Sequence, residues 1–95
     1  MSTQTHWRPK PGVLAQTLGD EVVLLDANNG VYFSLNPTGA RAWQMLSEGQ
    51  SLPQILAALE SEFAVTAEVL GADIQRLFDE LHQNKLIEPA PPLSS

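Results

Sequence analysis

The first third of the chain has the pattern of three short strands separated by turns. Apolar residues with few charges fill 13–18, 22–25 and 31–35, and polar residues with glycine separate these runs. Asn29-Gly30 is the strongest turn signal, because both residues tolerate the positive φ of a tight hairpin turn. The pattern therefore predicts a three-stranded antiparallel meander.

The predicted strands differ in how their apolar residues are arranged. Residues 22–25 are continuously apolar, which indicates a middle strand covered on both faces. In 31–35 apolar residues alternate with Tyr32 and Ser34, which is typical of a strand with one exposed face. We expect the third strand to lie at an edge of the sheet.

Beyond the strands the apolar residues recur every three or four positions, the period of a helix. The first helix is predicted over 37–48, because Asn36 can cap it and Pro37 suits a first turn, where its missing N–H is not needed. The second helix is predicted over 52–63, since the serine and glutamine at the ends of 51–54 fit a capping box.

The third and longest helix is predicted from a cap at Thr66 to about Lys85. Its apolar stripe consists of Leu70, Ile74, Leu77, Phe78 and Leu81. Leu86-Ile87 then closes the domain as a short extended piece. These elements predict an α+β fold in which a three-stranded antiparallel sheet is followed by three helices.

The organisation of the chain is simple. Polar residues, prolines and glycine dominate 1–12, which we expect to be a flexible N-terminal arm, and 89–95, which we expect to be a flexible tail. The folded domain is expected over 13–88. A chain of 95 residues is too short for two independent cores.

Composition narrows the classes of function. The chain has no cysteine, which excludes a disulfide framework, a thiolate zinc site and a cysteine nucleophile, and fits a cytoplasmic location. No apolar run is long enough to span a membrane, so we expect no membrane association. The formal net charge of −6, and an acidic segment from Thr66 to Lys85, disfavour nucleic acid as a partner.

No catalytic constellation is recognisable in the sequence. Ser34 has no histidine nearby in sequence to activate it, and Asp79 with His82 would supply only two ligands to a metal. Residues 39–43 lack the glycine pattern of a phosphate-binding loop. We therefore expect neither an enzyme nor a metal or cofactor site.

Two groups of polar residues stay open to alternative interpretations. Arg76 and Glu80 lie at i and i+4, and either form a surface ion pair or join Asp73 as a polar rim beside the apolar stripe. Tyr32 either packs within the meander or belongs to a binding groove. Trp43 falls on the inward stripe of its helix, so we expect it in the core.

The order D-x-x-x-G-x-Y-x-x-L-N-x-T/P-G, from Asp26 to Gly39, resembles the PqqD family. The resemblance covers about 13–88, and its motif consists of turn, strand and cap residues without a catalytic group. It implies a winged-helix-like domain that binds the leader of a ribosomally synthesised, post-translationally modified precursor peptide. The leader would add as a strand beside 31–35, and the domain would present it to a maturation enzyme of radical SAM, protease or cyclase type.

The peptide-binding positions that the resemblance implies come from the edge strand and from the helix facing it. They are Val31, Tyr32, Phe33, Ser34, Leu35, Asp73, Arg76, Leu77, Glu80 and Leu81. An exposed edge strand offers unpaired N–H and C=O groups to an extended peptide, while pockets beside it select side chains.

Several alternatives remain at this point. The family includes proteins of pyrroloquinoline quinone assembly and stand-alone recognition proteins of lasso-peptide and related clusters, and the segment 36–43 favours the wider family. The order of strands and helices also fits a winged-helix DNA-binding regulator. A third alternative is a dimerisation module that pairs two copies through the exposed strand, giving a homodimer.

Overall fold

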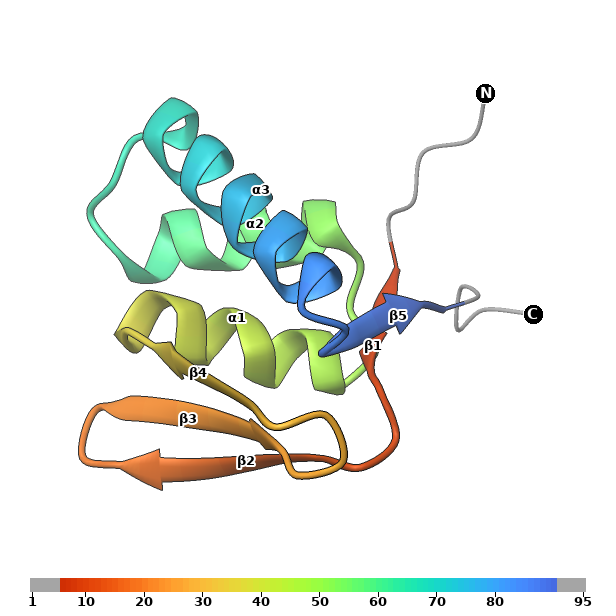
Figure 1. Ribbon diagram of the computed structural model, residues 1–95. Coiled ribbons are helices and arrows are strands. Elements are labelled where there is room, and N and C mark those ends of the chain that lie inside the picture. Colours follow the sequence, from red (N-terminus) through yellow and green to blue (C-terminus); the bar gives the residue numbers. More distant parts are fainter. Residues whose placement is uncertain (1–5, 91–95) are drawn as a thin grey trace.

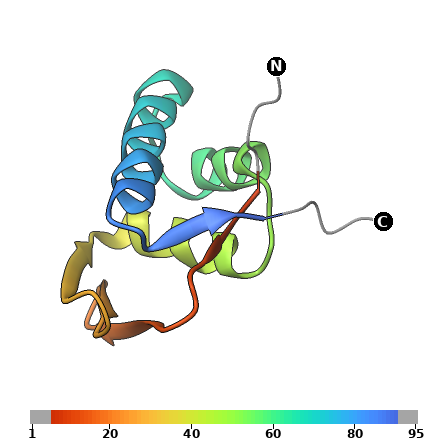
Figure 2. The ribbon, with the colours of Figure 1, turned by 45° about the vertical axis from the view of Figure 1, so that its right-hand side comes forward.

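The computed structural model describes residues 6–90 and contains two small sheets and three helices (Figure 1). The elements, in chain order, are β1 (Trp7–Pro9), β2 (Val13–Leu18), β3 (Glu21–Asp26), β4 (Val31–Leu35), α1 (Pro37–Ser47), α2 (Leu52–Glu62), α3 (Ala67–Gln83) and β5 (Ile87–Pro89). Helix α1 lies between the three-stranded sheet on one side and α2 with α3 on the other (Figures 1 and 2). The predicted α+β architecture is confirmed.

The meander β2-β3-β4 has the predicted strand order, with β3 in the middle and β4 at an edge. Leu24 pairs with Phe33, and Leu25 pairs with Tyr32. Val23 and Leu24 point to opposite faces and are both buried, which explains why this strand is continuously apolar. The inner face of the sheet packs on the helices and the outer face does not.

A buried carboxylate organises the turn between β3 and β4. Asp26 is 4% exposed, and its Oδ1 accepts hydrogen bonds from the backbone N–H of Asn28 at 3.1 Å and of Asn29 at 3.4 Å. Its Oδ2 accepts another from the Asn29 side-chain amide at 2.7 Å. Gly30 closes the turn with a φ of 69°. The turn therefore depends on Asp26 as well as on the Asn-Gly pair that the sequence indicated.

Side-chain caps fix the start of every helix, at the residues that the sequence predicted. The Oδ1 of Asn36 accepts from the Gly39 N–H at 2.8 Å at the start of α1. Ser51 and Gln54 form a complete capping box at α2. The Thr66 hydroxyl accepts a backbone hydrogen bond at the start of α3.

The core collects apolar side chains from both sheets and all three helices. Its members include Leu24, Leu35, Trp43, Met45, Leu46, Ile55, Leu59, Leu70, Ile74, Phe78, Leu81, Leu86 and Ile87. Trp43 lies in the core as predicted, and α1 contacts the sheet as well as the other two helices.

The expectation of a flexible arm over 1–12 and a flexible tail over 89–95 needs correction. Trp7–Pro9 and Ile87–Pro89 pair antiparallel as β1 and β5, and an ion pair at 2.7 Å joins Arg8 to Glu88 across them. Three-residue strands that contain proline carry almost no periodic signal, and their partners lie about 80 residues apart. The outer parts of the predicted arm and tail, 1–5 and 91–95, lie outside the described residues.

Replacing Asp26 tests the role of the turn carboxylate. We expect Asp26→Ala to lower the free energy of unfolding by about 1–3 kcal/mol, because the three hydrogen bonds that the buried carboxylate accepts from Asn28 and Asn29 are lost. Urea denaturation measures this change. The exposed Asp20 in the preceding turn is the matched control, and Asp20→Ala should change stability by less than about 0.5 kcal/mol. Equal effects of the two substitutions would contradict this account of the turn.

Candidate functional site

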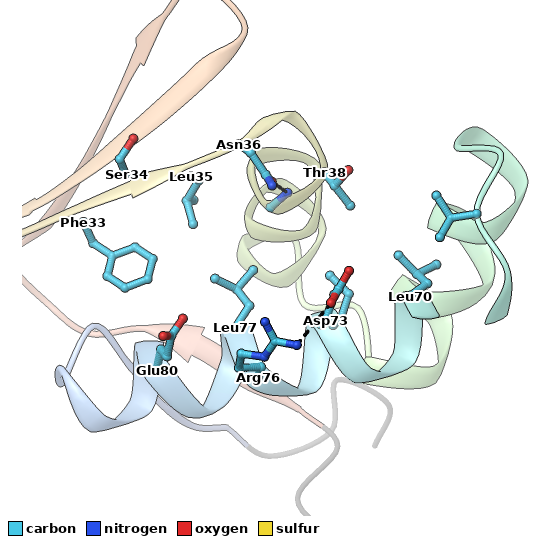
Figure 3. A pocket seen from close by; sticks show the side chains of 13 residues that line it. Phe33, Ser34, Leu35, Asn36, Thr38, Leu70, Asp73, Arg76, Leu77 and Glu80 are labelled. Atoms are coloured by element: carbon cyan, nitrogen blue, oxygen red, sulfur yellow. Dashed lines mark hydrogen bonds and ion pairs between the residues drawn. The ribbon is translucent and has the colours of Figure 1, made fainter. Parts of the chain in front are cut away.

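A groove of about 380 Å³ lies between β4 and α3 (Figure 3). Strand β4 contributes Phe33, Ser34 and Leu35, and α3 contributes residues along one face of the helix. The first turn of α1 supplies further lining, since the chain passes directly from the end of β4 into that helix. Strand β4, the start of α1 and helix α3 thus line one cavity.

The groove has an apolar floor. Phe33 and Leu35 reach it because alternate residues of β4 face inward, and Leu77 faces them from α3 (Figure 3). Leu35 is almost fully buried and belongs to the core, whereas Phe33 and Leu77 are half-buried and still present surface to the groove. An apolar side chain placed between Phe33 and Leu77 would be removed from water.

Gly39 allows the strand and the helix to come close at one side of the groove. A Cβ at this position would lie 3.4 Å from a methyl carbon of Leu35 and 3.4 Å from one of Leu77. It would also lie 3.2 Å from the Oδ1 of Asn36, the atom that caps α1. A side chain at residue 39 would therefore crowd Leu35, Leu77 and the Asn36 cap, so the close packing here requires glycine.

Charged side chains of α3 form a rim above the apolar floor. Asp73, Arg76 and Glu80 line the groove, and the Arg76 guanidinium lies 3.4 Å from the Asp73 carboxylate (Figure 3). Both of these side chains are mainly exposed, so this ion pair is weak and can exchange partners. The polar-rim interpretation is the one that the geometry supports, with Asp73 rather than Glu80 as the ion-pair partner of Arg76.

The backbone of β4 is paired on one side only. Its residues pair with β3 in the sheet, and no second strand of the described chain pairs with its other side. In an antiparallel ladder, alternate residues direct their N–H and C=O groups toward that other side. The edge therefore presents donors and acceptors next to the groove, in the spacing that an extended chain requires.

The structure brings together seven of the ten predicted positions. Those lining the groove are Phe33, Ser34, Leu35, Asp73, Arg76, Leu77 and Glu80. Val31 lies in β4 nearer the turn, and Tyr32 points to the outer face of the sheet, where its side chain is 67% exposed. Leu81 is 1% exposed and lies in the core, because it follows Ile74 by seven residues and shares its inward stripe.

Six lining residues lay outside the predicted set. They are Asn36, Thr38, Gly39, Val65, Leu70 and Ile74. The first three belong to the motif that follows β4, so their position after the edge strand was the available signal. Val65 precedes the α3 cap and had no periodic pattern to mark it.

The described residues contain little else that suggests chemistry. No group of three or more histidine, cysteine, aspartate or glutamate side chains among them could hold a metal ion. His82 lies against the Trp7 ring with centroids 4.9 Å apart, and Asp79 accepts a hydrogen bond from Gln75. Over residues 6–90, no helix has the length and apolarity needed to cross a membrane.

Helix α3 is the element that a winged-helix regulator would place in the DNA major groove. It carries Glu68, Asp73, Asp79 and Glu80 against one arginine, Arg76. An acidic helix of this kind repels the phosphate backbone. The charge distribution gives no support to DNA binding.

Sequence and structure comparisons with known proteins agree with each other. The family model described as coenzyme PQQ synthesis protein D (PqqD) matches residues 21–87, well over half of the chain. No curated protein matches the chain. One similar structure is TbiB1 in complex with the TbiA(beta) leader peptide, with a TM-score of 0.80 and 30% identity, covering 88% of this chain and 98% of the other.

A second similar structure is lasso peptide synthetase B1 complexed with the leader peptide. Its TM-score is 0.79 and its identity 31%, over 88% of this chain and 99% of the other. The family model spans β3, β4 and all three helices, which include every element that forms the groove. On this sequence and structural agreement, the chain belongs to the PqqD family.

Proposed function

We propose that this protein is a non-catalytic adaptor that binds the leader of a ribosomally synthesised, post-translationally modified precursor peptide. The leader adds as a strand to the free edge of β4 and lies in the groove against α3. The observation that carries this proposal is the unpaired β4 edge beside an apolar groove. The two similar structures, both complexes with leader peptides, support it.

The backbone and the side chains have separate tasks in this proposal. Hydrogen bonds to the β4 edge hold any extended peptide and supply affinity that depends little on sequence. Every second side chain of the added strand points inward, toward Phe33 and Leu77, and apolar residues fit there. The charged rim of Asp73, Arg76 and Glu80 then distinguishes leaders by the charges next to those apolar residues.

The adaptor presents the bound leader to a separate maturation enzyme. The Ser34 side chain alternates with the inward-facing Phe33 and Leu35 and so points to the other face of the sheet, and no histidine lies among the groove-lining residues to activate its hydroxyl. Similarity to lasso peptide synthetase B1 favours a lasso-type precursor over the precursor of PQQ, the product named in the family description. We place the adaptor in the cytoplasm, where ribosomes make such precursors.

Amide NMR shifts locate the peptide. We expect titration with synthetic TbiA(beta) leader to shift the amides of 31–39 and 70–80, because these segments line the groove. Residues 13–18 and 52–62, on β2 and α2, should stay unchanged. Shifts confined to those two segments would contradict the proposed site.

Proline substitution tests the strand-addition step. Adjacent residues of β4 direct their N–H groups to opposite sides, so proline at 33 and proline at 34 have different consequences. One variant should stay folded and lose about tenfold or more in peptide affinity, because it lacks a donor to the peptide. The other variant should be less stable, because its proline removes a backbone hydrogen bond to β3. Calorimetric titration and circular dichroism separate the two effects.

Ser34→Ala is the control for the proline at 34, since it keeps the N–H at the edge and shortens a side chain that faces away from Phe33, Leu35 and the groove floor. It should bind the leader as the unchanged protein does. Folded proline variants at both positions with unchanged affinity would overturn strand addition.

Charge reversal tests the rim. We expect Arg76→Glu to weaken leader binding by about 1–3 kcal/mol, because three carboxylates would then stand along one side of the groove. Lys85→Glu makes the same change in net charge at an exposed residue outside the groove and should alter affinity by less than about 0.5 kcal/mol. Similar losses for both variants would show a general charge effect instead of a contact.

A further inference from the structure

The opposite edge of the meander, β2, also lacks a second strand partner within the described chain, and none of its residues lines the groove beside β4. Strand β2 pairs with β3 on one side, and within residues 6–90 no strand pairs with its other side. It lies at the outer margin of the sheet, away from α2 and α3 (Figures 1 and 2). Leu14 is 64% exposed and Leu18 is 54% exposed.

This edge lacks the devices that usually prevent strand pairing. Proteins protect free edges with charged residues, proline or a bulge. Val13–Leu18 contains neither charge nor proline, and it pairs with β3 residue by residue without a bulge. An unprotected apolar edge is suited to pairing with another strand.

The sequence of β2 is complementary to itself. Leu14, Gln16 and Leu18 share the outer face because alternate residues of a strand point the same way. In an antiparallel pair of β2 strands centred on Gln16, Leu14 of each copy lies opposite Leu18 of the other copy. We propose that two copies of this protein associate through β2 in this register, with the two-fold axis passing at Gln16.

Charges flanking the strand favour the same arrangement. Lys10 lies shortly before β2, and Asp20 and Glu21 follow it. The antiparallel pairing brings the basic end of one copy to the acidic end of the other, whereas parallel pairing would bring like charges together. The paired segment itself is uncharged, so the net charge of −6 on each copy acts only at longer range.

The outer face supplies additional apolar surface next to the seam. Leu14, Leu25 and Tyr32 form one row across the three strands, as the register shows. In the dimer, Leu18 of the second copy extends this row by one strand. The resulting six-stranded sheet has β4 at both outer ends, so both grooves remain open and the dimer does not compete with the proposed peptide.

Cysteine cross-linking tests the register. The chain has no native cysteine, so Gln16→Cys introduces a single thiol that faces its own copy across the axis. We expect mild oxidation to link this variant at least about tenfold faster than Thr17→Cys, whose two thiols are offset along the strands, or Ala27→Cys in the exposed β3–β4 turn. Equal rates for the three variants would overturn the register.

Charge complementation tests the association itself. We expect sedimentation equilibrium to show a concentration-dependent dimer for the unchanged protein and monomers for Leu14→Lys/Leu18→Lys and for Leu14→Glu/Leu18→Glu. An equimolar mixture of the two variants should form a heterodimer, because each lysine then faces a glutamate. Circular dichroism confirms folding, which is expected since both leucines are exposed.

Two results would overturn the proposal. One is a protein that stays monomeric up to about 1 mM, a concentration at which even weak specific pairs associate. The other is a dimer that persists in both charged variants, which would place the contact elsewhere, such as at β4. Titration of the same variants with leader peptide measures binding in the groove independently of association through β2. Failure of the dimer proposal and failure of the peptide proposal are therefore distinguishable.

Discussion

The cap at Asn36 is the interaction on which the candidate site depends. By accepting the Gly39 N–H at 2.8 Å, its side chain turns the chain from β4 directly into α1. Pro37 supports the same turn, because its ring fixes a helical φ and needs no hydrogen-bond acceptor. The chain therefore leaves the sheet at Leu35 and does not return to pair with β4. The free edge is a consequence of where this helix begins.

Helix α1 then sets the distance between the two walls. It packs on the sheet with one side and on α3 with another, so the strand and the third helix are positioned relative to each other through it. A Cβ added to Gly39, in the first turn of α1, would lie 3.4 Å from a Leu35 methyl carbon in one wall and 3.4 Å from a Leu77 methyl carbon in the other. A larger residue there would fill the space where β4 and α3 approach. One small residue in α1 thus influences the size of a groove formed mainly by other elements.

Short sequence patterns were sufficient to predict those parts of the fold that depend on contacts between residues close together in the chain. The three caps, the meander and its edge strand were predicted because turn residues and apolar periodicity are written within a few neighbouring positions. The role of Asp26 was missed, since its carboxylate is buried only once the turn has formed. Leu81 was assigned to the groove, but a helical stripe is too broad to separate core positions from groove positions by spacing alone. The β1–β5 pairing joins segments that no local pattern connects.

The β1–β5 pairing brings the two ends of the described chain together. Besides the ladder between β1 and β5, the Ala90 N–H donates to the His6 carbonyl at 3.0 Å, so the two ends of the described chain are neighbours. A short linker from residue 90 to residue 6 would close the backbone, and new termini opened in the turn between α1 and α2 would interrupt neither a helix nor a strand. The domain is thus suited to circular permutation, in which the same packing is reached from a different starting residue and α3 precedes β4 and α1 along the chain.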